Sequence, residues 1–155
     1  GGQERLIRSG TLPTPLIVGF SEAMDIMNKN LDININNLRL LRDRLHKNFL
    51  KFDNSIQLNG PDLSKNRIPN NLNYSVKGVN AAELTESLGN YVAFSTGSAC
   101  STGNIEPSYV LTAIGLDTEA ALSSFRISVG LNSKKEDIDK AVKIISNKIE
   151  FLKNK

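Results

Sequence analysis

Residues 123–155 read SSFRISVGLNSKKEDIDKAVKIISNKIEFLKNK, and within this stretch the spacing of apolar residues changes. Phe125, Ile127 and Val129 alternate with polar residues, which predicts a half-buried strand. Ser133 and Glu136 then have the spacing of a helix-capping box. Beyond them, apolar residues recur every three or four positions: Ile138, Ala141, Val142, Ile145, Ile149 and Leu152. A strand followed by an amphipathic helix is therefore expected.

The rest of the chain also alternates between helical and extended patterns. Helices are predicted over 14–30, 33–52 and about 80–88, and from Pro107 to a stop at Gly115. Asn80 with Glu83 resembles a capping box for the third of these helices. Strands are predicted over 55–58, 72–76 and 91–94. The fold class is α/β or α+β, a small sheet covered by helices.

Length and composition limit the function classes. A chain of 155 residues makes one ordinary domain, and it contains no apolar run of the roughly 20 residues that span a membrane. The net charge is only +3. The one basic cluster (Arg39, Arg42, Arg44 and Lys47) is expected to be a solvated helix face, so neither a nucleic-acid nor a membrane partner is predicted. The single cysteine excludes an internal disulfide, which is compatible with a cytoplasmic location.

Cys100 lies in the run STGSACSTGN, residues 95–104. Its neighbours are small and polar, whereas a core cysteine packs among apolar residues. We therefore expect a loop on which the reactivity of the thiol matters more than its packing. About five residues on either side would let the thiol sweep up to ~17 Å, which suits a carrier better than a fixed nucleophile. From the residues alone, a functional and an incidental thiol remain equally open.

Other candidate residues give weaker signals. His46 lies on the basic helix and is expected to be solvated, so neither a Cys-His dyad nor a zinc site is supported. Arg126 should point away from the face of Phe125 and Ile127, which favours an arginine protecting a sheet edge over one that binds a carboxylate. Arg8–Thr11 precedes a predicted helix and could bind phosphate, although an ordinary capping loop is favoured.

Several segments together resemble pyridoxal-phosphate-dependent cysteine desulfurases. Residues 1–15, GGQERLIRSGTLPTP, resemble the family stretch GGGxExxxRSGTxP. RIPNNLNYSVKGV at 67–79, STGSACSTG at 95–103, EPSYVLTAIGL at 106–116 and SSFRISVGLNSKKEDID at 123–139 match in the family's order. The long cysteine loop is similar to the group I type, associated with iron–sulfur-cluster assembly and nitrogen fixation.

The resemblance implies a role for three residues. Such enzymes convert L-cysteine to L-alanine, using pyridoxal phosphate as the electron sink. Cys100 matches the nucleophile that takes the sulfur as a persulfide and delivers it to an iron–sulfur scaffold or other acceptor protein. Arg126 matches the arginine that binds the substrate carboxylate, which reverses the edge interpretation. Thr11 matches the residue that binds the cofactor phosphate of the neighbouring subunit, which implies a homodimer.

The resemblance also implies a domain organisation. Residues 1–31 match the end of the large cofactor domain, and residues 32–155 match the small domain with the cysteine loop at 95–106. The implied fold is the small domain of a fold-type I enzyme, with a mostly antiparallel sheet covered by helices. The Schiff-base lysine of the family lies upstream of the GGG motif, outside this chain. We therefore expect a C-terminal fragment that is inactive alone.

Three alternatives remain open from the sequence. A selenocysteine lyase, or a desulfurase dedicated to thiolation of tRNA or DNA, would share the fold and most motifs. A non-catalytic relay module would receive persulfide on Cys100 from another protein. A piece of a longer polypeptide without independent function is the third, because the chain opens with Gly1-Gly2-Gln3-Glu4 rather than methionine.

Overall fold

The computed structural model describes residues 1–96 and 106–155. The chain forms two compact units, Gly1–Asn34 and Ile35–Lys155. The first contains the short 3-10 helix η1 (Gln3–Leu6), a loop and the beginning of the helix α1 (Thr14–Phe52). The second contains the remainder of α1 and all later elements.

Helix α1 differs from the prediction of two helices over 14–30 and 33–52, because it continues through the expected break. Residues 31–36 read LDININ and include neither proline nor glycine. Nothing in that stretch removes a backbone donor or favours a helix stop, so one helix is the default. The predicted start at Thr14 followed by Pro15 is confirmed.

The second unit is built on a four-stranded antiparallel sheet in the order β1-β2-β4-β3. Its strands are β1 (Ile56–Leu58), β2 (Asn71–Val76), β3 (Ser95–Thr96) and β4 (Ser124–Ser128). The expected small antiparallel sheet is confirmed. The strand predicted over 91–94 is wrong, because the backbone amides of Tyr91 and Val92 bond to the carbonyl of Leu88 and turn the chain out of a helix.

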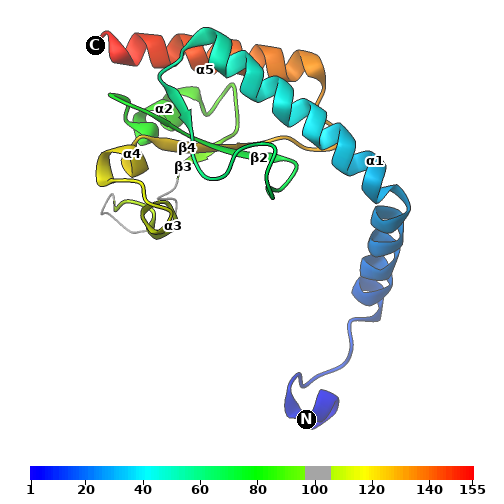
Figure 1. The fold of residues 1–155 in the computed structure, drawn as a ribbon. Helices are drawn as coiled ribbons and strands as arrows, with labels where there is room; N and C mark the ends of the chain where they lie inside the picture. The colour runs from blue at the N-terminus through cyan, green and yellow to red at the C-terminus, as the bar shows by residue number, and fades with distance from the viewer. Residues whose placement is uncertain (97–105) are drawn as a thin grey trace. The chain divides into compact units, whose positions relative to one another are not determined.

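One face of the sheet carries the core. The second-unit part of α1, together with α2 (Ala81–Leu88) and α5 (Lys135–Lys153), covers this face, as Figure 1 shows. Phe49 of α1 packs edge-on against Tyr74 of β2 and Phe125 of β4, and all three side chains are fully buried. These paired aromatic rings bind the helix layer to the sheet.

The first residues of α2 and α5 are capped by side chains, and in α5 the cap lies one residue from its predicted position. Asn80 caps α2 through its Oδ1, which accepts hydrogen bonds from the amides of Ala82 and Glu83 at 2.9 and 3.2 Å. For α5 the predicted Ser133–Glu136 box is shifted by one residue. Asp137 accepts the amide of Lys134 at 2.9 Å, while the Ser133 hydroxyl accepts the amide of Gly130.

Two short helices lie on the other side of the sheet (Figure 1). Helix α3 (Tyr109–Ala113) ends before Gly115, whose φ of 95° makes it the expected stop. Helix α4 (Thr118–Leu122) was not anticipated, and it begins where Asp117 accepts the amide of Ala120 at 2.8 Å. None of the described helices is long and apolar enough to cross a membrane.

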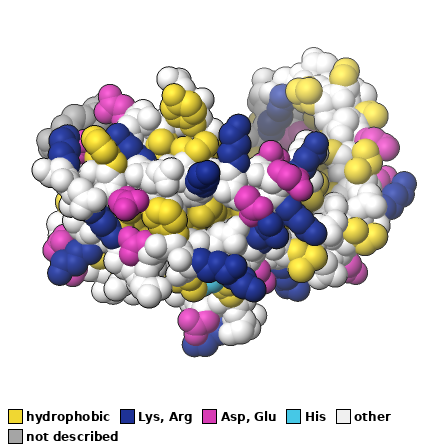
Figure 2. Space-filling view, turned by 90° about the horizontal axis from the view of Figure 1, so that it is seen from above, with side chains coloured by type: hydrophobic (Ala, Val, Ile, Leu, Met, Phe, Trp, Pro, Cys, Tyr) yellow, Lys and Arg dark blue, Asp and Glu magenta, His cyan; other side chains and the backbone are white. Residues whose placement is uncertain are grey.

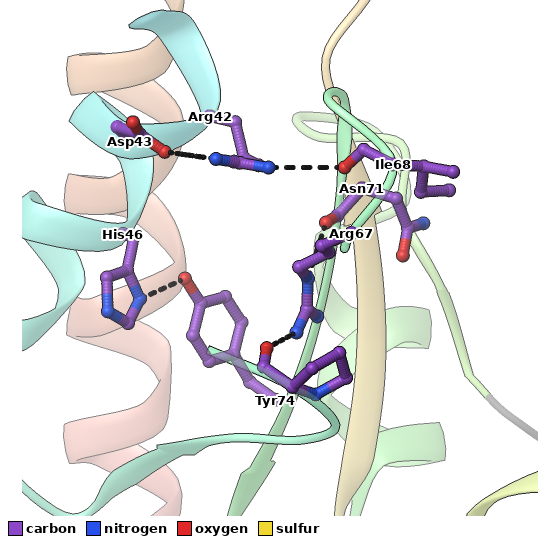
Figure 3. A network of polar contacts seen from close by, with 8 residues as sticks. Arg42, Asp43, His46, Arg67, Ile68, Asn71 and Tyr74 are labelled. Carbon is purple, nitrogen blue, oxygen red and sulfur yellow. Dashed lines mark hydrogen bonds and ion pairs between the residues drawn. The ribbon is translucent and has the colours of Figure 1, made fainter. Parts of the chain in front are cut away.

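The sequence predicts a solvated helix face for the basic cluster on α1, and this prediction is wrong for Arg42. Arg42 is only 3% exposed, and its guanidinium bonds to Asp43 and to the carbonyl of Ile68 (Figure 3). Arg44 pairs with Asp139 of α5, and this hydrogen bond is the main cause that lowers the pKa of the Asp139 carboxyl. On the face seen in Figure 2, basic and acidic side chains are interspersed rather than gathered by sign.

Candidate functional site

The sheet face opposite the core is polar. Side chains of successive strand residues alternate between faces, so the residues that alternate with Leu72, Tyr74 and Val76 in β2 point the other way. On this face three cross-strand pairs lie side by side in β2 and β4: Asn71 with Ser128, Asn73 with Arg126, and Ser75 with Ser124. A polar sheet face that other parts of the chain partly cover is a candidate binding site.

A cleft of about 850 Å³ lies over this face, and we call it the polar-face cleft. Strands β2, β3 and β4 contribute Asn71, Asn73, Ser95, Thr96 and Arg126. The walls are the turn 59–61, Arg67 and residues 106–111 with Ile114. Of the described residues, two arginines and no lysine line the cleft.

Arg126 points into this cleft from the centre of the sheet. Its neighbours Phe125 and Ile127 are buried while Arg126 is exposed, which confirms the predicted alternation. The edge interpretation is wrong, because β4 has β2 on one side and β3 on the other. Its Nη2 donates to the Ser95 hydroxyl at 3.3 Å, and no carboxylate of the described residues forms a salt bridge with it. The guanidinium is therefore available to an anion.

Arg67 is a second arginine of the cleft, and the sequence did not single it out. It donates to three backbone carbonyls, those of Asn59 at 3.0 Å, Pro61 at 2.6 Å and Asn71 at 3.3 Å. Figure 3 shows Arg67 beside Asn71. Burial is the main cause that lowers the pKa of its guanidinium. Arg67 therefore clamps the 59–61 turn to the start of β2. Since isolated carbonyls carry no sequence signal, only the folded chain could reveal this role.

A buried amide joins the same wall to the sheet. Asn59 is 6% exposed, and its Nδ2 donates to Asn73 Oδ1 at 2.7 Å and to the Ser124 hydroxyl at 3.0 Å. Its Oδ1 accepts from the Ser75 hydroxyl at 3.1 Å. The side chain of Asn59 is thus fully paired, which is expected of a buried amide. It fixes the cross-strand pairs next to Arg126.

The segment that contains Cys100 begins and ends at the cleft. Thr96, at the end of β3, and Glu106, the first residue described after the gap, both line it. Cys100 lies outside the described residues, so its predicted role is not tested by the structure.

His46 is half-buried rather than solvated, which corrects the expectation for the only histidine. Its Nδ1 lies 3.0 Å from the Tyr74 hydroxyl, and the two rings stack at 6.0 Å between centroids (Figure 3). Burial is the main cause that lowers the pKa of its imidazole. Tyr74 belongs to the core face of the sheet, and His46 is not among the residues that line the cleft.

Thr11 lies in the first unit, in the exposed loop that leads to α1. The Arg8 side chain folds back onto this loop, and its Nη1 donates to the carbonyls of Ser9, Gly10 and Thr11. Gly10 has φ of 107°, a backbone conformation that favours glycine. The Ser9 hydroxyl is also engaged, because it donates to the carbonyl of Gly1. The hydroxyl of the exposed residue Thr11 is the kind of donor that suits a phosphate ester. The residues present therefore fit the phosphate of the implied cofactor.

The chain belongs to the aminotransferase class-V family, which matches residues 2–141. It is 41% identical over 154 residues to a protein named "Cysteine desulfurase IscS" from Ruthia magnifica subsp. Calyptogena magnifica, covering 99% of this chain and 37% of the relative. It is 40% identical to "Cysteine desulfurase, mitochondrial" of Saccharomyces cerevisiae, covering 99% of this chain and 30% of that protein.

Solved structures agree with this relationship. A structure titled "NIFS-LIKE PROTEIN" superposes with a TM-score of 0.81 at 30% identity, over 97% of this chain and 38% of that one. The fold is therefore that of part of a NifS-like protein, as the resemblance implied. The chain spans 30–38% of the length of these relatives and of that solved structure.

Proposed function

We propose that this chain is the sulfur-accepting part of a pyridoxal-phosphate-dependent cysteine desulfurase. The substrate is L-cysteine, the products are L-alanine and a persulfide on Cys100, and the sulfur passes on to an iron–sulfur scaffold or another acceptor protein. Residues 1–31 belong to the end of the large cofactor domain and residues 32–155 to the small domain, in a homodimeric enzyme.

One observation carries the proposal. Arg126 stands in the polar-face cleft without a carboxylate partner among the described residues, and both ends of the Cys100 segment reach that cleft. Cys100 is four residues from Thr96, so the covalent chain keeps the two Cα atoms within about 14 Å. A carboxylate held by Arg126 and a thiol delivered from Thr96 would therefore meet in one place.

The reaction needs two contributions from this chain. Arg126 holds the carboxylate of the bound cysteine through the two parallel hydrogen bonds that a guanidinium can donate. The Cys100 thiolate attacks the sulfur of the substrate. An S–S bond forms while the bond from the substrate carbon to sulfur breaks, and the carbon gains a proton to give alanine. Substrate and thiol together contain every atom of the alanine and the persulfide.

Pyridoxal phosphate, when bound, supplies the electron sink that makes the carbon–sulfur bond labile. Of this chain's residues, Thr11 would bind the phosphate of the cofactor in the neighbouring subunit of the homodimer. The cleft lining includes no lysine among the described residues, so the amine that carries the cofactor has to come from outside the cleft described here. The 155-residue chain alone is therefore expected not to desulfurate cysteine.

A chimaera provides the decisive experiment. The segment of the Ruthia magnifica relative that this chain matches is replaced by residues 1–155, and the purified chimaera is loaded with pyridoxal phosphate. We expect alanine to form from cysteine, and mass spectrometry to find one added sulfur on Cys100. A chimaera that folds and binds the cofactor but forms no alanine would refute the proposal.

Single substitutions in the chimaera separate the two roles. Cys100→Ala should abolish the persulfide, while Arg126→Met should lower kcat/KM by about 10- to 100-fold, the worth of a hydrogen bond to a charged group. Arg39→Met is the matched control, because Arg39 is an exposed arginine of α1 that does not line the cleft. Persulfide on Cys100 of the isolated chain, from a persulfide donor and without pyridoxal phosphate, would instead favour the relay module.

A further inference from the structure

Asn73 of β2 and Ser95 of β3 are the two polar residues that pair directly with Arg126 on the sheet. Asn73 and Arg126 form a direct cross-strand pair between β2 and β4, and both line the polar-face cleft. Directly opposed residues of antiparallel strands have Cβ atoms about 5 Å apart, on the same face. A group bound by the guanidinium of Arg126 over this face therefore lies on the same side of the sheet as the Asn73 amide.

The direction of the Asn73 amide is set by a chain of hydrogen bonds that begins outside the cleft. The Ser124 hydroxyl donates its one proton to the carbonyl of Ala120 at 2.6 Å. It can then only accept from Asn59, which must present its Nδ2 rather than its Oδ1. The second Nδ2 proton of Asn59 goes to Asn73 Oδ1 at 2.7 Å. With its oxygen held by Asn59, Asn73 is left with Nδ2, a donor, to offer to the cleft.

We infer that Asn73 is a second carboxylate-binding residue of the cleft: its Nδ2 donates to the substrate carboxylate beside the Arg126 guanidinium, and Asn59 and Ser124 act as positioning residues. This inference rests on the proposed function for the identity of the substrate. A carboxylate has four lone-pair sites, so the fork of Arg126 leaves room for a further donor. The pair would select amino acids with a free carboxylate over amines that lack one.

The test uses the pyridoxal-phosphate-loaded chimaera. Asn73→Ala should raise KM for L-cysteine by about 10- to 100-fold and leave kcat within about twofold, because the lost contact is present equally in bound substrate and transition state. The inhibition constant of cysteamine, which has the amine and thiol but no carboxylate, should stay unchanged. Asn48→Ala is the matched control, since Asn48 donates to Asp139 on α5 and does not line the cleft.

The positioning residues have their own readout. Ser124→Ala removes the hydroxyl that fixes Asn59, so it should raise KM for L-cysteine by a smaller factor, again without changing cysteamine inhibition. A general loss of structure would weaken cysteine and cysteamine binding together. An unchanged KM in Asn73→Ala, or a parallel loss for cysteamine, would overturn the inference.

A second measurement keeps the inference separate from the proposed function. In the 155-residue chain, the Nδ2 proton resonances of Asn73 should shift on titration with L-alanine and not with ethylamine. If the unmutated chimaera formed no alanine, the proposed function would fail, and this titration would still decide the inference. Absence of a shift with L-alanine would count against Asn73 in either case.

Discussion

Replacing Arg67 with methionine tests whether the wall of the cleft depends on a guanidinium clamp. Methionine keeps much of the side-chain length but donates to none of the three carbonyls that Arg67 joins. The bond to Pro61 is exposed and contributes little, whereas those to Asn59 and Asn71 are partly buried. A net 0.5–1.5 kcal/mol for each partly buried bond gives a loss of about 2 kcal/mol.

Urea unfolding of the 155-residue chain measures this loss. With a slope of about 2 kcal/mol per M, the midpoint should fall by roughly 1 M. Arg67→Lys should recover less than half of the difference, because one ammonium cannot reach three carbonyls in a fork. Lys65→Met is the matched control: its pair with Asp62 is exposed, so its effect should stay within about 0.5 kcal/mol.

Two results would refute this reasoning about Arg67. If Arg67→Met unfolded within about 0.5 kcal/mol of the parent, water would replace the clamp without loss. If Arg67→Lys behaved as the parent, the positive charge alone would matter, and the hydrogen-bond geometry would not.

Two further predictions concern other parts of the second unit. Burial lowers the pKa of His46, so as the pH falls the imidazole of the unfolded chain takes up a proton before that of the folded chain, near pH 6.5. The free energy of unfolding should therefore decline from about pH 7.5 to about pH 5.5. This decline should be steeper than in His46→Gln, which has no imidazole to titrate. Parallel urea curves for both proteins across that range would contradict this. Asn80→Ala should cost about 1 kcal/mol by removing the cap of α2, while Asn80→Asp should cost almost nothing, as thermal unfolding would show. Equal melting temperatures for the two variants would rule out the cap.

Much of the secondary structure followed from local rules. The alternation around Phe125 predicted β4 and the outward direction of Arg126, because side chains of a strand point to opposite faces wherever the strand lies. The cap at Asn80 and the stop at Gly115 depend on backbone chemistry within a few residues. Family resemblance added a role for Arg126 and Cys100 that no periodicity contained.

Other features depended on contacts between segments far apart in the sequence. Arg42 and His46 were expected to be solvated because their neighbours on the helix are charged. Arg42 is buried and His46 is half-buried because β2 and residue 68 pack against that turn. The alternation of residues 125–129 favoured a position for Arg126 at the edge of the sheet, but β3 pairs with β4 and places Arg126 inside the sheet.

The cleft itself is of this second kind. The bonds of Asn59 to Asn73 and Ser124 span 14 and 65 residues, and no local pattern marks amides that meet only after the sheet forms. The alternation of residues next to Arg126 could therefore predict which face of the sheet its guanidinium points to, because alternation is a property of the strand backbone. Which groups stand beside it was decided by strand register, because register alone brings distant side chains to within hydrogen-bonding distance.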